Sequence, residues 1–370
     1  MRSSGMNSNT NAFEAQVAAL SAKLAPKIMN QHVAAVSLIN LPGNQPPWRG
    51  TGIQVARGQA FSLFASGRIQ WSAQMPERHG GPKFHLWARI TPGGQIMNLT
   101  QNTGSFIADM DGELELGIYM GVWKNAGGEL ATPTKLYAGL SGSLTCWVVA
   151  WRNDPASGLA ALVRLQPDSW FLTAEMVRYA SPIQKPAGWK YLIETGEADI
   201  FASSHTESTP AIELDADDDQ GIITTPIEIA LNPSTTLSWR WRAETLPSEV
   251  AENTVHTHDY FSIATEFDNG RDLTWIWSAS LAPETHFDCP IRAWTPRETH
   301  LVVRSGTADL GVWHCERRNV YQDVASAMGP PPRKIIRVWL IAVTSFQHRR
   351  ARASFANIVL ANDLGGATVL

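Results

Sequence analysis

The sequence has few cysteines, few charged side chains and no long apolar run, and each scarcity excludes a class of protein. Its 370 residues include three cysteines, none in a Cys-x-x-Cys pair, which argues against a disulfide framework or a zinc ribbon. Charged residues make up 17% and the net charge is -4, so no basic surface indicates nucleic acid or an anionic membrane as a partner. Because no run reaches about 18 apolar residues, we expect no membrane span.

Other familiar patterns are also missing. The first ten residues are polar and lead into charged side chains, unlike a secretory signal. We therefore expect a cytoplasmic protein with reduced thiols. The sequence has no Walker loop, Gly-x-Gly-x-x-Gly, Gly-x-Ser-x-Gly or His-Glu-x-x-His motif, which disfavours nucleotide cofactors and serine-elbow hydrolases. We expect no cofactor, apart from the transition-metal alternative considered below.

What the sequence does have is tryptophan, with 15 residues against 12 phenylalanines and 6 tyrosines. After residue 40 the chain falls into short apolar runs separated by Gly, Pro and Asn, a pattern typical of sandwiches and barrels. Phe13, Val17 and Leu20 recur at helical spacing before that point. We predict an all-β protein with two tandem antiparallel β-sandwiches, the second jelly-roll-like. The expected parts are a helical segment (1–40), a first sandwich (41–155), a linker and packing segment (156–221) and a second sandwich (222–370).

Two tryptophan pairs alternate with other residues along predicted strands. Trp239 and Trp241 form one pair, and Trp275 and Trp277 form the other, so each pair lies on one face of its strand. The simpler interpretation places these indoles between two sheets. The alternative is a ligand platform, because flat indoles stack on sugar rings. Tryptophans near turns are better candidates for that role: Trp48, Trp71, Trp123 and Trp294.

The C-terminal half resembles an uncharacterised bacterial family, domain of unknown function 3047. The resemblance runs from about Thr225 to Leu360 and rests on LSWRWR at 237–242, FDNGR at 267–271, LTWIWS at 273–278 and ERRNVYQD at 316–323. Where the family carries an Asp-rich segment, this chain has TSFQHRR at 344–350, and the family's paired acids appear as His258-Asp259. The resemblance implies no settled biochemical function.

The first β region is similar, in order and spacing, to bacterial galactophilic lectin-type sandwiches. The similarity rests on WRGTGI at 48–53, GQAFS at 58–62 and the stretch 112–128. Those lectins bind calcium and sugar through an Asn-Asp turn and a later Asp-Asn pair. Here the corresponding stretches read YMGVW at 119–123 and KNAG at 124–127. Since the acids are missing, calcium-dependent sugar binding does not carry over to this chain.

Two polar clusters stand out in the second half of the chain. On an extended strand, His256 and His258 project from one face, and with Asp259 they supply ligand types suited to zinc or iron. The simpler interpretation is a polar strand entrance with solvated histidines. In the second cluster, Glu316 beside His314 suggests a general acid or base, with Arg317 as a substrate clamp. The simpler interpretation there is an Arg–Asp network that fixes the segment to the sheet.

Two further residues complete the candidates. Glu266 lies within an otherwise apolar strand, and facing inward it would have a raised pKa suited to an acid, whereas facing outward it is an ordinary solvated residue. Cys315 cannot pair directly with His314, because neighbouring residues of a strand face opposite ways, and we expect it to be a buried structural thiol.

The leading hypothesis is a binding protein that holds a carbohydrate or a small apolar–polar molecule in a Trp-lined groove of the second sandwich. The alternative is a hydrolase or lyase at the same groove, and a third interpretation is a structural or assembly protein that forms homo-oligomers through the first sandwich. The candidate catalytic residues are Glu266, Glu316, His314, Arg317 and Arg304. The candidate ligand-binding residues are Asp259, Trp275, Trp277, Trp294 and Trp313, and the candidate metal ligands are His256, His258 and Asp259.

Overall fold

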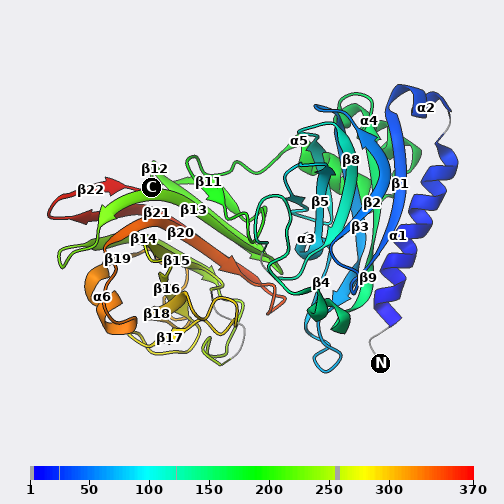
Figure 1. Cartoon of the computed structure of the whole chain (residues 1–370). Helices are drawn as coiled ribbons and strands as arrows, with labels where there is room; N and C mark the ends of the chain where they lie inside the picture. The colour runs from blue at the N-terminus through cyan, green and yellow to red at the C-terminus, as the bar shows by residue number, and fades with distance from the viewer. Residues whose placement is uncertain (1–3, 25, 122, 255–258) are drawn as a thin grey trace. The chain divides into compact units, whose positions relative to one another are not determined.

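The computed structural model describes residues 4–24, 26–121, 123–254 and 259–370 (Figure 1). The chain divides into two compact units. Unit 1 comprises Met1–Pro182 and Ile193–Glu197, and unit 2 comprises Ile183–Leu192 and Ala198–Leu370. Across the described residues, no helix combines the length and the apolar character needed to cross a membrane.

Unit 1 contains two β-sheets and most of the helices. A five-stranded sheet has the order β1-β9-β3-β4, with β7 also paired to β3, and a four-stranded sheet has the order β2-β8-β5-β6. The strands are β1 (Val33–Pro42), β2 (Trp48–Val55), β3 (Ala60–Gln70), β4 (His79–Gly80), β5 (Leu86–Thr91), β6 (Met97–Asn98), β7 (Thr103–Ile107), β8 (Gly112–Ile118) and β9 (Ser141–Trp151). The helices are α1 (Ser4–Lys23), α2 (Pro26–Gln31), α3 (Pro82–His85), the 3₁₀ helix η1 (Thr134–Gly139), α4 (Pro155–Leu165) and α5 (Trp170–Ala180).

Strand β9 is buried on both faces, and this organises unit 1. Leu144 and Val148 join the core between the two sheets, whereas Trp147 and Val149 join a second core under the helices. Phe13 of α1 contributes to that second core, as do residues of α4 and α5. The N-terminal helix predicted from the spacing of Phe13, Val17 and Leu20 is therefore confirmed, and these residues pack in that core. Unit 1 is a sandwich with a helical layer on the outer face of its five-stranded sheet.

Unit 2 is a sandwich of a seven-stranded and a six-stranded sheet. The seven-stranded order is β10-β13-β20-β15-β16-β18-β17, and the six-stranded order is β11-β12-β21-β14-β19, with β22 paired to β21. The elements are β10 (Lys190–Tyr191), β11 (Phe201–Thr206), β12 (Thr209–Asp217), β13 (Gln220–Ala230), β14 (Thr236–Thr245), β15 (Ser262–Phe267), β16 (Asp272–Ser278), β17 (His286–Asp288), β18 (Glu298–Ser305), β19 (His314–Asn319), α6 (Val320–Ala327), β20 (Lys334–Val343), β21 (Arg350–Asn362) and β22 (Gly365–Thr368).

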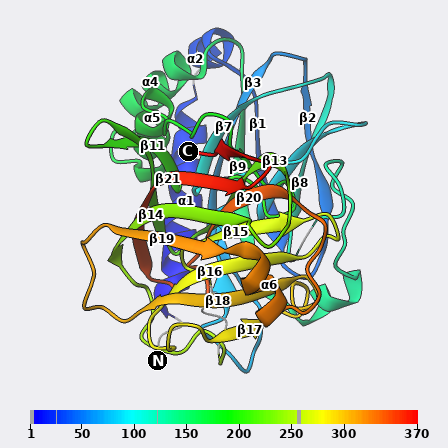
Figure 2. The ribbon, with the colours of Figure 1, turned by 90° about the vertical axis from the view of Figure 1, so that its left-hand side faces the viewer.

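The two sheets of unit 2 enclose one aromatic core. Trp239 and Trp241 of the six-stranded sheet pack with Trp275 and Trp277 of the seven-stranded sheet. Figure 2 shows β21, β14 and β19 side by side in the six-stranded sheet. The pairing of β16 with β18 is parallel, although the other strand pairs of this sheet are antiparallel. The connection between them passes through β17, which pairs antiparallel with β18.

The predicted fold class is confirmed, because the chain is mostly β with antiparallel sheets and an N-terminal helix. One local expectation differs from the structure. Residues 33–39, predicted to be helical, form part of β1, which pairs with β9. The segment 156–221, expected to be a linker and packing segment, contains α4, α5, β10, β11 and β12. Helix α4 begins there because Asp154 caps it, accepting a hydrogen bond from the Ser157 N–H at 3.4 Å, and Pro155 follows the cap.

Candidate functional site

The two faces of the seven-stranded sheet have opposite chemistry. On β16, Leu273, Trp275 and Trp277 join the core, and they alternate with Asp272 and Thr274 on the other face. Trp275 and Trp277 are completely buried. Their indole N–H groups donate within unit 2, Trp275 to Asp323 Oδ2 at 2.8 Å and Trp277 to the Gly306 carbonyl at 3.0 Å. These two candidates are core residues and do not line a groove.

The polar face carries a carboxylate on each of three neighbouring strands. Glu266 on β15 is paired in register with Asp272 on β16, which is paired in turn with Glu298 on β18. All three are buried, and adjacent strands lie about 4.8 Å apart. Each end of this carboxylate row has a different environment. Glu266 accepts hydrogen bonds from Arg337 Nη1 at 2.7 Å and from Trp339 Nε1 at 3.2 Å.

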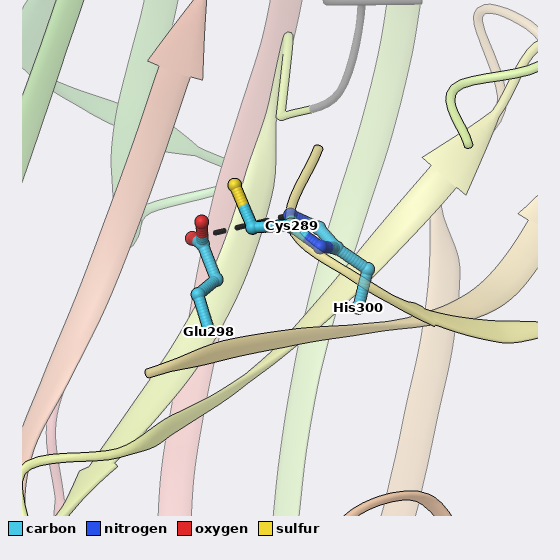
Figure 3. A group of neighbouring side chains, drawn as sticks. All are labelled: Cys289, Glu298 and His300. Carbon is cyan, nitrogen blue, oxygen red and sulfur yellow. Dashed lines mark ion pairs between the residues drawn. The ribbon is translucent and has the colours of Figure 1, made fainter. Parts of the chain in front are cut away.

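The Glu298 end of the row meets a thiol and an imidazole. Cys289 Sγ, a Glu298 carboxylate oxygen and a His300 ring nitrogen all lie within 4.8 Å of one another, and all three residues are buried (Figure 3). His300 Nε2 is 3.9 Å from Glu298 Oε1 and 2.9 Å from Asp259 Oδ2. The Phe287 ring stacks on the His300 ring at 4.9 Å between centroids. We call Asp259, Cys289, Glu298 and His300 the buried donor cluster.

Burial and mutual repulsion both act on these acids. Burial raises the pKa of Asp272 to about 7, although Arg297 and His300 oppose the shift. Burial, together with the charges of Asp259 and Asp272, raises the pKa of Glu298 well above its usual value. Burial and the nearby carboxylates also raise the pKa of the Cys289 thiol. The arrangement therefore concentrates negative charge where water is excluded, and that favours either protonation or a bound cation.

The three predicted metal ligands and one predicted ligand-binding tryptophan belong to this part of the sequence. Asp259 belongs to the buried donor cluster, and the Ser262 hydroxyl donates to its Oδ1 at 3.2 Å. The predicted metal ligands His256 and His258 lie outside the described residues. Trp294 is largely buried, packs edge-on against Trp339 at 6.4 Å, and has the Arg297 guanidinium 4.5 Å from its ring centroid.

The second predicted cluster lies on the other side of the seven-stranded sheet. Glu316 accepts hydrogen bonds from Trp241 Nε1 at 3.0 Å and from Arg304 Nε. The His314 ring lies 5.6 Å from Trp277, a core residue. Glu316 and His314 thus belong to the aromatic core side, away from the polar face that carries Glu266. Glu266 and Glu316 therefore cannot line one site, because the seven-stranded sheet lies between them, and the hypothesis of a shared site is wrong.

The outer side of β19 carries the other candidates. Arg317 is exposed, and the Trp313 ring lies 5.0 Å from the Arg240 guanidinium and 5.3 Å from that of Arg242. Cys315 is also exposed, so its expected burial is wrong. Cys315 and Arg317 are alternate residues of β19, so both lie on its solvent-exposed face.

The expected Arg–Asp network exists, but it is made by Arg318. Arg318 Nη2 lies 2.7 Å from Asp323 Oδ1, and Arg318 Nη1 lies 2.7 Å from Glu284 Oε1. These bonds join the end of β19 to α6 and to the segment before β17. The simpler interpretation of this cluster, a network that fixes the segment, is therefore confirmed.

Unit 1 contains a polar cleft that the sequence did not predict. It encloses about 1260 Å³ beside α1, β3, β9 and the start of α5. Its wall includes Asn11, Gln16, Ser66, Arg68, Asn102 and Trp170. The Trp170 side chain is 44% exposed. Its position at the first residue of α5, just after the polar turn 166–169, is the sequence feature that could have indicated an open indole.

The tryptophans near turns, which were the candidate ligand platforms, contact other side chains of the protein. Trp48 stacks on Trp123 at 5.3 Å and has the Arg89 guanidinium 4.4 Å from its ring centroid. Trp123 is buried. Trp71 donates its indole N–H to His85 Nε2 at 2.8 Å. In these contacts the rings pack against protein, so they present less surface to a ligand than Trp170 does.

Comparison with known proteins finds one family match, in the second half of the chain. Residues 187–359 match the family described as a protein of unknown function (DUF3047). The predicted resemblance is confirmed, and the match begins earlier than the expected start near Thr225. No curated protein matches the chain.

Solved structures provide two further similarities. The chain resembles the N-terminal domain of EclA, a PllA-like lectin, at 15% identity and a TM-score of 0.24, covering 31% of this chain and 95% of that one. It also resembles the xyloglucanase domain of NopAA, a type three effector from Sinorhizobium fredii, at 10% identity and a TM-score of 0.30, covering 50% and 97%. The lectin likeness agrees with the predicted resemblance of the N-terminal region.

Proposed function

We propose that this protein binds carbohydrate and that the cleft of unit 1 is the binding site. The observation that carries the proposal is the cleft wall, which combines amide and hydroxyl side chains with one open indole and also includes Arg68 and Glu14. Sugars present hydroxyl groups around an apolar ring face, so neutral hydrogen-bonding groups and an aromatic plane are the complementary surface. The cleft volume of about 1260 Å³ is large enough for an oligosaccharide.

One residue of the cleft wall, Gln16, has a buried acceptor that lacks a hydrogen-bond donor. Gln16 Oε1 is buried at the wall and accepts no hydrogen bond from the residues that the structure describes. A buried acceptor without a partner costs free energy, and a sugar hydroxyl would supply the missing donor. Two other wall residues already form hydrogen bonds within the protein. Gln70 Nε2 donates to three carbonyls, and Glu14 accepts from the Thr145 hydroxyl at 2.8 Å. Gln16, Asn102 and Trp170 are therefore the proposed contact residues.

The other two hypotheses receive less support from the structure. A hydrolase or lyase using Glu266 together with Glu316 and His314 would need these groups at one substrate, whereas they lie on different sides of a sheet. A structural or assembly role through unit 1 leaves the unpartnered Gln16 acceptor unexplained. The proposed binding site also differs in place from the leading hypothesis, which set the groove in the second sandwich.

The test is a glycan array with the full-length protein, followed by calorimetric titration of the oligosaccharide that gives the strongest signal. Trp170→Ala removes the stacking plane and should weaken binding about tenfold or more, equivalent to about 1.4 kcal/mol. Asn102→Ala, at an exposed position, should weaken binding without affecting the fold. Val177→Ala is the matched control, because Val177 is exposed on the same helix but lies outside the cleft wall. An array at background level, or full affinity in both cleft variants, rules the proposal out.

A further inference from the structure

The buried donor cluster of unit 2 combines the ligand types that zinc prefers. A thiol, an imidazole and a carboxylate converge within 4.8 Å at Cys289, His300 and Glu298 (Figure 3). Cysteine sulfur, histidine nitrogen and carboxylate oxygen are the three kinds of protein ligand found around Zn²⁺. Asp259 adds a second carboxylate, with its Oδ2 2.9 Å from His300 Nε2. The three mutually close donors do not include Asp259, so its carboxylate must turn toward them to complete a tetrahedral set.

The spacing of the donor atoms is close to what zinc requires. With bonds of about 2.0–2.3 Å, the ligand atoms of a tetrahedral site lie about 3.3–3.8 Å apart. His300 Nε2 and Glu298 Oε1 are 3.9 Å apart, close to that range. His300 Nε2 and Asp259 Oδ2, at 2.9 Å, must separate by roughly half an ångström as the ion enters between them. Such a shift is a small rotation of one carboxylate.

The backbone holds the donors in place. Glu298 and His300 are alternate residues of β18, so both face the polar side of the sheet. Cys289 directly follows β17, and its N–H donates to the Glu298 carbonyl at 3.0 Å. The Thr295 hydroxyl donates to the Cys289 carbonyl at 2.8 Å. Strand pairing and backbone hydrogen bonds therefore hold Cys289, Glu298 and His300, and the Asp259 carbonyl accepts a hydrogen bond from the Val343 N–H at 2.8 Å.

The charge balance of this region also calls for a cation. Asp259, Asp272 and Glu298 are all buried there. Arg297 Nε lies 4.0 Å from Asp272 Oδ1, and that oxygen accepts no hydrogen bond from a described residue. Several carboxylates out of contact with water repel one another strongly, and a divalent ion at their centre converts that repulsion into attraction.

We propose that Cys289, Glu298, His300 and Asp259 bind one zinc ion in the interior of unit 2. Binding releases the thiol proton of Cys289 and any proton held by the carboxylates to solvent, so affinity falls as pH is lowered. Because four protein donors leave no open position, the ion has a structural role and joins β17, β18 and the Asp259 segment. This site is separate from the proposed carbohydrate site, which lies in unit 1.

The first measurement is metal content. The full-length protein is purified from zinc-supplemented medium, dialysed and analysed by mass spectrometry, and we expect about one equivalent of zinc. Cys289→Ser and His300→Ala should lower zinc affinity by more than the roughly 10- to 100-fold that follows loss of an outer hydrogen-bonding partner. Cys315→Ser and His286→Ala are matched controls at exposed positions and should retain the zinc. Less than about 0.2 equivalents in the wild-type protein would overturn the proposal.

The second measurement begins with the wild-type protein and reports the ligand atoms directly. Chelated wild-type protein is titrated with cobalt(II), which replaces zinc in such sites and reports its ligands by absorption. A thiolate-to-cobalt charge-transfer band in the near ultraviolet, with tetrahedral d–d bands, supports a site that includes Cys289. Cobalt binding without the thiolate band, or a band that persists in Cys289→Ser, contradicts the assignment.

Discussion

At the scale of single residues, neighbouring carboxylates on one sheet face differ because their partners differ. Glu266 is bound by the Arg337 guanidinium and the Trp339 indole N–H, both of which favour a charged acceptor. Asp272, its partner in register, accepts a hydrogen bond from the Thr274 hydroxyl at 3.3 Å and has only a distant arginine. Glu266 and Asp272 are close together in the sequence and paired in the sheet, but only Glu266 has an arginine within hydrogen-bonding distance.

Asp272 gives a pH prediction for the metal-free protein. Burial raises the pKa of Asp272 to about 7 from its ordinary value of 3.8, so the folded state binds a proton that the unfolded state has released. The contribution of Asp272 to the free energy of unfolding is fully present below about pH 4. It is lost as pH rises toward about 7, with a slope of about 1.4 kcal/mol per pH unit. Urea unfolding of chelated protein across this window, compared with Asp272→Asn, isolates the effect.

Comparing the wild type with Asp272→Asn separates the effect of this carboxyl from that of every other group in the protein. Asp272→Asn should flatten the pH dependence relative to wild type, whereas Asp288→Asn, at an exposed position on β17, should leave it unchanged. If the wild type and Asp272→Asn show the same slope between about pH 5 and about pH 7, the carboxyl does not carry the proton.

At the scale of elements, two glycines lie where β3 and β9 approach each other closely. Gly67 has φ +117° and Gly142 has φ +84°, both in the left-handed region that favours glycine. A Cβ on Gly67 would lie 2.3 Å from the Ser143 carbonyl oxygen, and one on Gly142 would lie 2.2 Å from the Arg68 carbonyl oxygen. Both glycines also line the proposed carbohydrate cleft.

Gly67→Ala should therefore destabilise unit 1 through both strain and a steric clash. We expect a loss of roughly 3 kcal/mol, because the backbone of β9 cannot move away without breaking strand pairs. Gly58→Ala separates the two causes, since Gly58 also has positive φ (+83°) but open space around it, and it should cost only about 1 kcal/mol. Urea unfolding measures both, and equal losses would show that the clash is relieved elsewhere.

Strand pattern was predictable from sequence, but strand pairing was not. The alternation in Trp239–Trp241 and Trp275–Trp277 identified two strands and the side chains of one face, because that information is local. The parallel pairing of β16 with β18 depends on a connection through β17, and no local pattern encodes it. Residues 33–39 were mistaken for helix because their apolar residues followed a true helix, and the partner β9 lies far along the chain.

The dependence on strand pairing also explains which residues of the candidate sites were found from the sequence and which were missed. Asp259 and Glu266 were identified because acids and histidines are rare in an apolar stretch. Cys289 and Glu298 were missed because they join Asp259 only through the register of β17 and β18. Sequence reasoning can list polar residues in strands, but which of them share a face across neighbouring strands is fixed by long-range pairing.

At the scale of the whole molecule, the chain builds separate hydrophobic cores for its two units. The core of unit 2 contains Trp239, Trp275 and Leu340, and those of unit 1 contain Leu116, Val148 and Trp147. None of these core clusters includes described residues of both units. Because each core supplies its own cooperative stabilisation, a perturbation inside one unit should act first on that unit.

Zinc removal tests this independence by hydrogen–deuterium exchange on the intact chain. If the ion joins β17 to β18, chelation should speed amide exchange in 286–305 by about tenfold or more, since loss of a bound ligand raises the population of the opened state. Amides of β3 and β9 should keep their rates, because their hydrogen bonds and cores belong to unit 1. Returning zinc should restore protection, and Cys289→Ser should exchange like the chelated wild type with or without zinc. Faster exchange in both units on chelation would instead indicate that unfolding of unit 2 propagates through the chain, and the two cores could not then be treated as separate cooperative units.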